Sequence, residues 1–267
     1  MKYAALAIDL DGTLLVGDEV PPANVDGIRA ALNAGLKVII ATARWSHFAV
    51  RLGNGLGIGG PVIACSGAQV YDPALPGDVF DRRLPLDFVE ALYAICNQER
   101  CIATVTLGDH VEFKMDGRPA ERHLTPELRF TEALRLTDGN LPRIAAIQGS
   151  RCCERIRREL EAPFRDTVNV LDSIGPTGKI ILALTAREAN KGEALGAACA
   201  HMGLDPGSVV AFGDAENDVA MFRLAGASVA MGQADAATQS AATYVSRSNT
   251  EAGVAHAIHR LLERGEL

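Results

Sequence analysis

Asp9 and Asp11 stand two residues apart in a segment, Asp-Leu-Asp-Gly-Thr over residues 9–13, that directly follows an apolar run over residues 4–8. A buried strand is expected to end where the first charge appears, because an unpaired buried carboxylate is costly. Both acids should then lie at the carboxyl end of a strand, where open α/β sheets bind their ligands. One carboxylate there can attack phosphorus while the other moves the proton. The pair therefore predicts phosphoryl transfer through an aspartate, with a divalent metal nearby.

Backbone amides of the turn through Gly12 and Thr13 could also bind phosphoryl oxygens. A turn with two solvated acids stays open as an alternative for this pair. An EF-hand calcium loop is excluded, because that pattern needs Asp or Asn at the fifth position and glycine at the sixth. Thr13 and Leu14 occupy those positions.

A second acidic group, Gly-Asp-Ala-Glu-Asn-Asp over residues 213–218, also follows an apolar run and opens a helical pattern. Asp214 and Asp218, together with Asp9, would offer the oxygen ligands that Mg²⁺ prefers. Taken alone, Asp214 could equally cap the helix, with Glu216 and Asp218 stabilised in its first turn.

Thr42 and Lys191 are candidate phosphate ligands. Thr42 follows the apolar run over residues 38–41, with Arg44 close by, and a hydroxyl and amide at a helix N-terminus can bind an anion. A simple N-cap is the alternative for Thr42. Lys191 opens a helical segment, where the helix dipole disfavours a cation. That position indicates a bound anion, although a solvated lysine is the more common case.

One further phosphate motif fails. Gly-Pro-Thr-Gly-Lys-Ile over residues 175–180 is similar to a P-loop, but Ser173 stands where the first glycine belongs and Ile180 replaces the Ser or Thr. We interpret this segment as a turn.

Alternating strands and helices predict a doubly wound, Rossmann-like α/β core with a parallel sheet. Continuous apolar runs suit parallel strands buried on both faces, and they cover residues 4–8, 38–41, 61–65, 209–212 and 228–231. Helical patterns, several of which end at a glycine, cover residues 22–34, 191–202, 216–224 and 251–264.

The middle of the chain has a different pattern, which predicts an inserted α+β domain over residues 83–185 within a core of residues 1–82 and 186–267. Apolar and polar residues mix more evenly there. Short strands are expected over residues 102–107, 111–113, 143–148, 168–171 and 179–184, and helices over residues 86–99 and 151–161.

Composition limits the protein class. The 267 residues, 48% hydrophobic and 22% charged, are typical of a globular protein with one large or two moderate domains. A net charge of −7 argues against a broad nucleic-acid-binding face. No apolar stretch approaches the roughly 20 residues of a membrane span, and the run before Asp9 is too short for a signal peptide. We expect a cytoplasmic protein with neither nucleic acid nor membrane as a partner. Its oligomeric state is unknown.

The six cysteines are Cys65, Cys96, Cys101, Cys152, Cys153 and Cys199. They form no CxxC pair and no zinc-type spacing. We expect buried or unreactive thiols in a reducing cytosol rather than a disulfide framework.

The four polar segments, in this order, resemble the haloacid dehalogenase-like superfamily of phosphohydrolases. Residues 9–13 look like its first motif, Thr42 its second, Lys191 its third, and Asp214 with Asp218 its fourth. The insertion resembles the type IIB cap of the Cof-type branch. Ser-Gly-Ala over residues 66–68 and Val-Ala-Met-Gly over residues 229–232 are similar to Cof-type landmarks. The resemblance covers nearly the whole chain.

The resemblance implies that Asp9 is the nucleophile and Asp11 the general acid and base. It places Mg²⁺ on the carboxylates of Asp9 and Asp214, the backbone carbonyl of Asp11, and Asp218 directly or through water. Thr42, Lys191 and Asn217 would hold the phosphoryl group. The activity implied is that of a Mg²⁺-dependent phosphatase acting on a small phosphorylated metabolite, with a sugar phosphate as one candidate.

Two rival functions are a phosphomutase with the same aspartyl-phosphate and a non-catalytic phosphometabolite-binding protein. Two residues depart from the usual pattern of the Cof-type branch: Ala43 stands where glycine is frequent, and Ser66 where asparagine is frequent. These departures concern substrate fit rather than reaction class. Specificity is expected in the cap, where the candidate polar contacts, each more often a surface residue, are Lys114, Arg118, Arg122 and His123.

Overall fold

The computed structural model describes residues 2–108, 110–115, 127–137, 140–174 and 180–265, which form two compact units. We call Met1–Asp81 with Asn190–Leu267 the core unit, and Arg82–Ala189 the inserted unit. The turn expected over residues 175–179 and the candidates Arg118, Arg122 and His123 lie outside the described residues.

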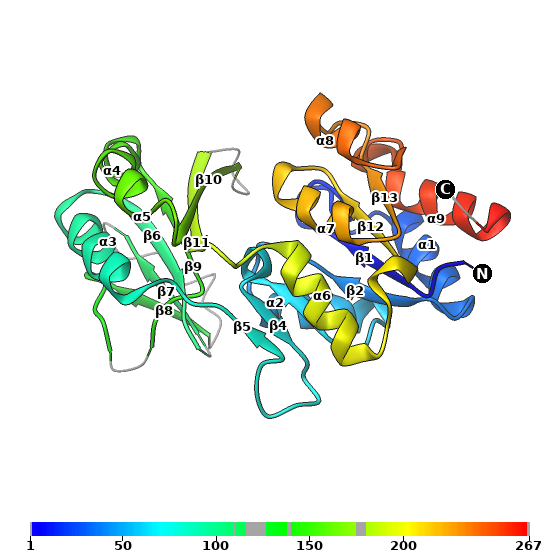
Figure 1. The fold of residues 1–267 in the computed structure, drawn as a ribbon, viewed down its shortest axis with the longest axis horizontal. Coiled ribbons are helices and arrows are strands. Elements are labelled where there is room, and N and C mark those ends of the chain that lie inside the picture. The colour runs from blue at the N-terminus through cyan, green and yellow to red at the C-terminus, as the bar shows by residue number, and fades with distance from the viewer. Residues whose placement is uncertain (1, 109, 116–126, 138–139, 175–179, 266–267) are drawn as a thin grey trace. The chain divides into compact units, whose positions relative to one another are not determined.

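The core unit is built on a five-stranded parallel sheet of order β14-β13-β12-β1-β2 (Figure 1). The strand that precedes the paired aspartates therefore has a neighbour on each side. The strands are β1 (Ala5–Ile8), β2 (Lys37–Ile40), β12 (Val209–Gly213), β13 (Ala227–Ala230) and β14 (Tyr244–Val245). The helices are α1 (Pro22–Asn33), α2 (Ser46–Leu56), α6 (Lys191–Met202), α7 (Val219–Leu224), α8 (Ala236–Ala241) and α9 (Gly253–Arg264).

Both faces of this sheet are buried, because successive strand residues point to opposite sides. Leu6 and Ile8 of β1 pack with α1, α2 and α9 on one face. Ala5 and Ala7 pack with α6 and α7 on the other. Helices on both faces of a parallel sheet confirm the predicted doubly wound α/β core.

The strand expected over residues 61–65 differs from its prediction. As β3 (Val62–Ala64) it joins the parallel sheet only through an isolated bridge from Ile63 to Ala41. It pairs instead in an antiparallel sheet with β4 (Gln69–Tyr71), which in turn pairs with β5 (Phe80–Asp81). The reversal follows from a tight turn at Cys65 and Ser66, whose φ angles of 53° and 57° lie in the left-handed region.

Two predicted helices are interrupted. The segment over residues 216–224 begins as a 3₁₀ turn, Glu216–Asp218, before α7. The segment over residues 251–264 breaks at Ala252, whose φ of 55° is left-handed, so that α9 begins at Gly253. Helix α8 and the two-residue strand β14 have no counterpart in the sequence prediction, and α2 begins four residues after Thr42, where a helix was expected to start.

The inserted unit is an α+β layer with its own core. Its sheet order is β10-β11-β9-β6-β7-β8, and only the β7–β8 pair is parallel. Helix α3 packs on the sheet through Phe88, Val89 and Leu92. The strands are β6 (Ile102–Thr106), β7 (Val111–Lys114), β8 (Leu128–Thr131), β9 (Ile144–Gln148), β10 (Val168–Ile174) and β11 (Ile180–Ala186). The helices are α3 (Leu86–Gln98), α4 (Ser150–Ile156) and α5 (Ala162–Phe164). A π-helical turn at Arg157–Glu161 joins α4 to α5.

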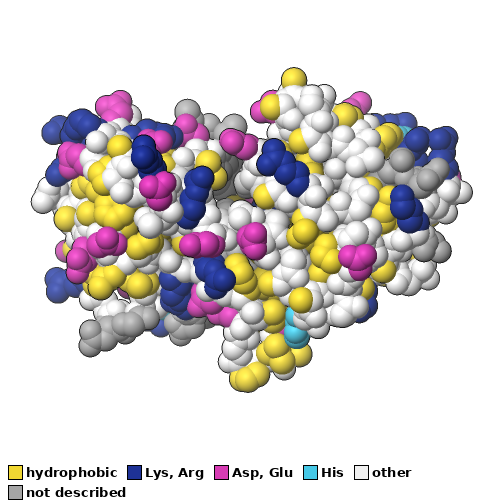
Figure 2. Space-filling view, in the orientation of Figure 1, with side chains coloured by type: hydrophobic (Ala, Val, Ile, Leu, Met, Phe, Trp, Pro, Cys, Tyr) yellow, Lys and Arg dark blue, Asp and Glu magenta, His cyan; other side chains and the backbone are white. Residues whose placement is uncertain are grey.

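The surface mixes both signs of charge. On the face that Figure 2 shows, Lys and Arg side chains are interspersed with Asp and Glu side chains. Among the described residues, no helix combines the length and the apolar character needed to cross a membrane.

Candidate active site

The strand register brings the predicted site residues to one edge of the core sheet. Ile8 pairs with Ile40 on one side and with Phe212 on the other. The next residues along these strands lead to Asp9, Thr42 and Asp214, so all three leave the sheet at its carboxyl edge. We call residues 9–21, between β1 and α1, the first loop. The backbone N–H of Asp9 donates to the carbonyl of Phe212 at 3.0 Å, which fixes the start of this loop beside β12.

Lys191 occupies the centre of the site. It is the first residue of α6, a helix capped by the side chain of Asn190. Its fully buried ammonium donates to Asp9 Oδ1 and to Asp218 Oδ1, at 2.6 Å in each case. The anions that stabilise this lysine at a helix N-terminus are thus two carboxylates of the chain itself, those of Asp9 and Asp218.

Asp214 completes an acidic cluster with Asp9 and Asp218. One oxygen from each carboxylate lies within 4.8 Å of the others. Thr13 donates its hydroxyl to Asp214 Oδ1 at 3.0 Å and thereby orients this carboxylate. Three carboxylates and one ammonium leave two negative charges when all are ionised. The hard oxygen donors and this charge fit a divalent ion such as Mg²⁺.

Burial perturbs the acids of this cluster. Burial raises the pKa of Asp9 well above its ordinary value, against the attraction of Lys191 and with help from Asp218 and Asp214. Burial and the Asp218 carboxylate raise the pKa of Asp214 to about 6. Burial alone would lower the pKa of Lys191, but Asp218 and Asp9 raise it above its ordinary value. A divalent cation would favour the ionised carboxylates, because it opposes the same repulsion.

The capping interpretation of Asp214 is wrong, because the cap is made by Asp218. Asp218 Oδ2 accepts from the backbone N–H groups of Asp214 and Ala215 at 3.0 and 3.1 Å. This leaves the Asp214 side chain free to face Thr13. The same contacts tighten the first turn into the 3₁₀ form, which explains why α7 begins only at Val219.

Thr42 does not cap a helix either. Helix α2 begins four residues later, at Ser46, and Trp45 is its N-cap. Thr42 is fully buried, and its Oγ1 accepts from the backbone N–H of Arg44 at 3.0 Å. The hydroxyl therefore shapes a local turn at the carboxyl edge of β2.

Asp11 lies outside the buried acidic cluster and is paired with Arg44. The guanidinium donates from Nη2 to Asp11 Oδ1 at 2.6 Å and from Nε to Oδ2 at 3.0 Å, and it also reaches Asp18 at 2.8 Å. The Arg44 guanidinium lies over the Phe48 ring, 4.3 Å from its centroid. The proximity of Arg44 to Thr42 in the sequence was visible, but its contact across the first loop with Asp11 was not predicted.

The first loop is also held by groups that the sequence motifs do not include. Gly12 has a φ of 82°, and a Cβ there would overlap the Asp214 carboxylate. Gln233 Nε2 donates to the Gly12 carbonyl at 2.6 Å. Asn249 Nδ2 donates to the Leu15 carbonyl at 2.9 Å. These amides come from loops after β13 and β14, and no spacing in the sequence links them to residues 9–13.

Two remaining positions have simple surroundings. Asn217 is half-buried in the 3₁₀ turn that carries Asp218. Ser66 adopts the left-handed region, and its backbone N–H donates to the Thr42 carbonyl at 3.1 Å. Asparagine tolerates this region better than serine, so the departure at Ser66 adds strain beside Thr42.

Comparison with known proteins agrees with this geometry. The sequence profile of the haloacid dehalogenase-like hydrolase family matches residues 6–258. The putative phosphatase YxeH of Bacillus subtilis is 28% identical over 272 aligned residues, which cover 97% of this chain and 98% of that protein. The pyridoxal phosphate phosphatase YbhA of Escherichia coli is 28% identical over 291 aligned residues, covering 97% and 98%.

Solved structures share the fold. A haloacid dehalogenase-like hydrolase from Bacteroides thetaiotaomicron superimposes with a TM-score of 0.80 at 24% identity, covering 97% of this chain and 99% of that one. The subclass IIB sugar phosphatase BT4131 superimposes with a TM-score of 0.76 at 21% identity, covering 96% and 98%. The family resemblance inferred from the motifs is confirmed: this chain belongs to the haloacid dehalogenase-like hydrolases.

Proposed function

We propose that this protein is a Mg²⁺-dependent phosphatase that hydrolyses a small phosphorylated metabolite through an aspartyl-phosphate at Asp9. The supporting observation is the contact between Asp9 and Lys191. The nearly buried carboxylate of Asp9 lies 2.6 Å from the buried ammonium of Lys191, and Asp214 and Asp218 lie beside it. Phosphoryl transfer depends mainly on such positioning and charge neutralisation.

The reaction we propose has two displacements. Asp9 attacks phosphorus, the bond from phosphorus to the ester oxygen breaks, and Asp11 gives its proton to the leaving oxygen. Asp11 then takes a proton from water as that water attacks phosphorus. The bond from phosphorus to Asp9 breaks, and inorganic phosphate leaves. The half-exposed position of Asp11, held by Arg44, supports a role in exchanging protons with solvent-accessible groups.

Other residues of the core unit would bind and orient the reacting groups. The carboxylates of Asp9, Asp214 and Asp218 and the carbonyl of Asp11 would hold Mg²⁺. The bound ion would neutralise charge on the phosphoryl oxygens. Lys191 would hold Asp9 in place and, with Thr42 and Asn217, would contact the phosphoryl group.

The names of the relatives support a proposed substrate class. YbhA is named a pyridoxal phosphate phosphatase, and YwtE of Bacillus subtilis, 28% identical, is named a 5-amino-6-(5-phospho-D-ribitylamino)uracil phosphatase. Both names describe phosphate monoesters of small molecules. We assign the same class here, with the inserted unit as the cap that selects among such molecules. A cytoplasmic location is part of this proposal.

Asp9→Asn tests the proposal. A panel of phosphorylated metabolites, with and without Mg²⁺, should identify a substrate that releases phosphate only when Mg²⁺ is present. Asp9→Asn should then abolish release, whereas Asp26→Asn, which changes an exposed acid of α1, should retain it. Full activity in Asp9→Asn would overturn the proposal. Transfer of the phosphoryl group to a second sugar instead of water would identify a phosphomutase.

A further inference from the structure

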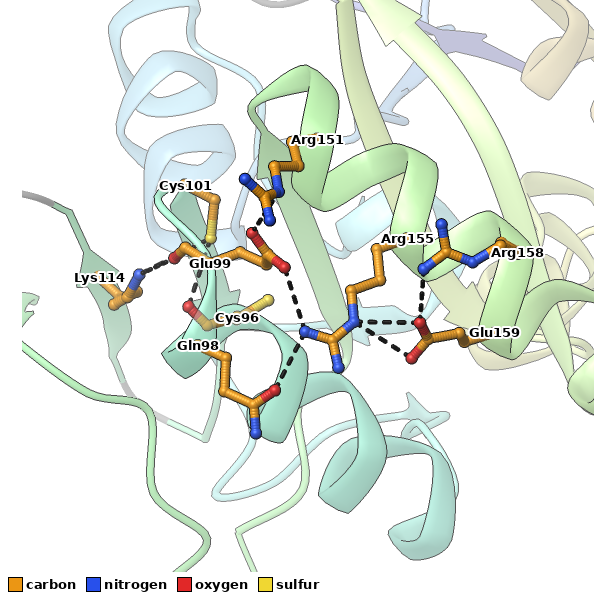
Figure 3. Close-up of polar contacts among 9 residues, drawn as sticks. All are labelled: Cys96, Gln98, Glu99, Cys101, Lys114, Arg151, Arg155, Arg158 and Glu159. Atoms are coloured by element: carbon orange, nitrogen blue, oxygen red, sulfur yellow. Dashed lines mark hydrogen bonds and ion pairs between the residues drawn. The ribbon is translucent and has the colours of Figure 1, made fainter.

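Three of the six cysteines converge inside the inserted unit: Cys96 and Cys101 are five residues apart, and Cys152 lies 51 residues further along the chain. Cys96 lies near the end of α3, Cys101 directly precedes β6, and Cys152 belongs to α4. Their three sulfur atoms lie within 4.8 Å of one another, and all three residues are buried. The thiol of Cys101 is directed to the carbonyl of Cys96, with Sγ at 3.6 Å from the oxygen (Figure 3). We call these residues the thiol cluster.

The backbone permits this close approach at Gly149, the residue that precedes α4. Gly149 has a φ of 126°, which L side chains rarely adopt. A Cβ there would lie 3.2 Å from the Arg100 carbonyl oxygen and 3.4 Å from Cys101 Cβ. Glycine therefore lets the start of α4 pack directly on the segment that carries Cys101, which places Cys152 beside it.

A buried cation borders the thiol cluster. Lys114, at the end of β7, is only 4% exposed. Its ammonium donates to the Glu99 carbonyl at 3.0 Å and lies 3.8 Å from Cys101 Sγ (Figure 3). Lys114 was expected to be a substrate contact or a surface residue, but it is buried, and its ammonium contacts the Glu99 carbonyl and the Cys101 sulfur. A lysine in this place favours a thiolate over a thiol.

The Glu99 carboxylate pairs with two arginines of α4 rather than with Lys114. The Glu99 side chain turns away from Lys114 and pairs with Arg151 at 3.2 Å and with Arg155 at 3.1 Å (Figure 3). The cluster thus combines a cation close to Cys101 Sγ with three sulfurs that lie within reach of one another.

Three mutually close sulfurs suit a metal ion better than a disulfide, which would use two of them and leave the third unpaired. Thiolates select soft ions such as Zn²⁺. Tetrahedral bonds of about 2.3 Å from zinc to sulfur place the sulfurs roughly 3.8 Å apart, inside the observed span. Three thiolates, one divalent ion and the Lys114 ammonium also sum to zero charge, which lowers the cost of burying them.

We propose that Cys96, Cys101 and Cys152 bind one thiophilic divalent cation of the Zn²⁺ and Cd²⁺ class, as a structural site of the inserted unit. Binding forms three metal–sulfur bonds and releases to solvent the protons of whichever thiols are not yet ionised. It joins the end of α3, the start of β6 and α4. The site is separate from the carboxylate cluster of the core unit in both residues and ligand chemistry.

The test is a Cd²⁺ titration of the full chain, reduced with a phosphine so that no small thiol competes, with excess Mg²⁺ present for the carboxylates. We expect a thiolate-to-cadmium absorption band that saturates at one equivalent and disappears when Zn²⁺ is added. Cadmium-113 NMR of the same sample should give a resonance in the sulfur-ligand range. Because these two measurements use the unaltered chain, they do not depend on whether any variant folds.

Alanine variants locate the site. Cys96→Ala, Cys101→Ala and Cys152→Ala should each lose the one-equivalent endpoint. Cys153→Ala is the matched control, since Cys153 is the next residue of α4 and its thiol is directed to the Ile147 carbonyl at 3.4 Å. It should retain the endpoint. The proposal is overturned if the unaltered chain gives no thiolate band, if its cadmium resonance lies in the oxygen-ligand range, or if the band survives in all three cluster variants.

Discussion

Replacing Gly12 with alanine tests the position of Asp214 without removing any functional group. Gly12 has a φ of 82°, and the added Cβ would overlap the Asp214 carboxylate. Gly17 lies in the same loop with a φ of 62°, but its Cβ would meet nothing within 4 Å. Gly17→Ala is therefore a matched control, which shares the backbone strain and lacks the collision.

The two variants should differ by a calculable amount. A left-handed residue with a side chain costs about 1–2 kcal/mol, and both variants carry this cost. Gly12→Ala also forces Asp214 away from the Thr13 hydroxyl, now 3.0 Å away. A hydrogen bond to a charged group contributes about 1.5–3 kcal/mol. We therefore expect losses of about 1–2 kcal/mol for Gly17→Ala and about 2.5–5 kcal/mol for Gly12→Ala.

Urea unfolding without Mg²⁺ measures these losses of stability. The Mg²⁺ concentration that gives half-maximal phosphatase activity measures the affinity of the site for Mg²⁺. Displacing a ligand or its support commonly weakens metal binding about 10–100-fold. Gly12→Ala should shift the half-saturating Mg²⁺ concentration by that factor, while Gly17→Ala should leave it unchanged. Equal stability losses, or an unchanged Mg²⁺ requirement in Gly12→Ala, would refute the assignment of Asp214 to the metal site.

Three further predictions concern the same site. Lys191→Met leaves Asp9 and Asp218 buried without their cation. Urea unfolding should therefore show that the free energy of unfolding falls by about 3–5 kcal/mol. A fall below about 1 kcal/mol would contradict a buried ion pair. The pKa of Asp214, raised from 3.8 to about 6, predicts that the half-saturating Mg²⁺ concentration rises as pH falls below about 6. It also predicts that stability without Mg²⁺ falls as pH rises from 3.8 to about 6, because the folded state holds the extra proton over that range. Asp214→Asn should weaken the stability trend, and the part that remains comes from Asp9, whose pKa is also raised. Arg44→Met should lower kcat about tenfold, because Asp11 is no longer held in place. The same variant should lose only about 0–1 kcal/mol of stability. Asp18→Asn is the control: it removes only the other partner of Arg44 and should keep the wild-type kcat.

The elements that carry the site follow closely from sequence because their signals are local. The apolar runs before Asp9 and Asp214 are buried strands in register, and the helix that opens at Lys191 begins at that residue. Strand pairing then accounts for the convergence of residues about 200 positions apart, because parallel neighbours end at one edge of the sheet.

Contacts between side chains of different loops were not predictable in the same way. The guanidinium of Arg44 reaches Asp11, and Gln233 reaches Gly12, through loop conformations that no periodicity encodes. The expectation that the thiols are buried holds for all of them except Cys153, which is partly buried. Spacing along the chain could not show that Cys96, Cys101 and Cys152 meet, because they do so only after α4 folds back on the end of α3. Thr42 and Asp214 do not act as helix caps because their side chains have other partners. The Thr42 hydroxyl accepts from the backbone N–H of Arg44, and the Asp214 carboxylate accepts from the Thr13 hydroxyl.

The place of β1 between β2 and β12 also determines when the site can form during synthesis. Ala5 pairs with Val209, so β12, the second neighbour of β1, emerges 209 − 5 = 204 residues later. At typical translation rates of about 5–20 residues per second, the first strand waits roughly 10–40 s for that neighbour. The inserted unit, whose hydrophobic core is continuous within Arg82–Ala189, emerges completely in the meantime and can fold first. Asp9, the proposed nucleophile, is thus made well before β12, the strand that completes its surroundings.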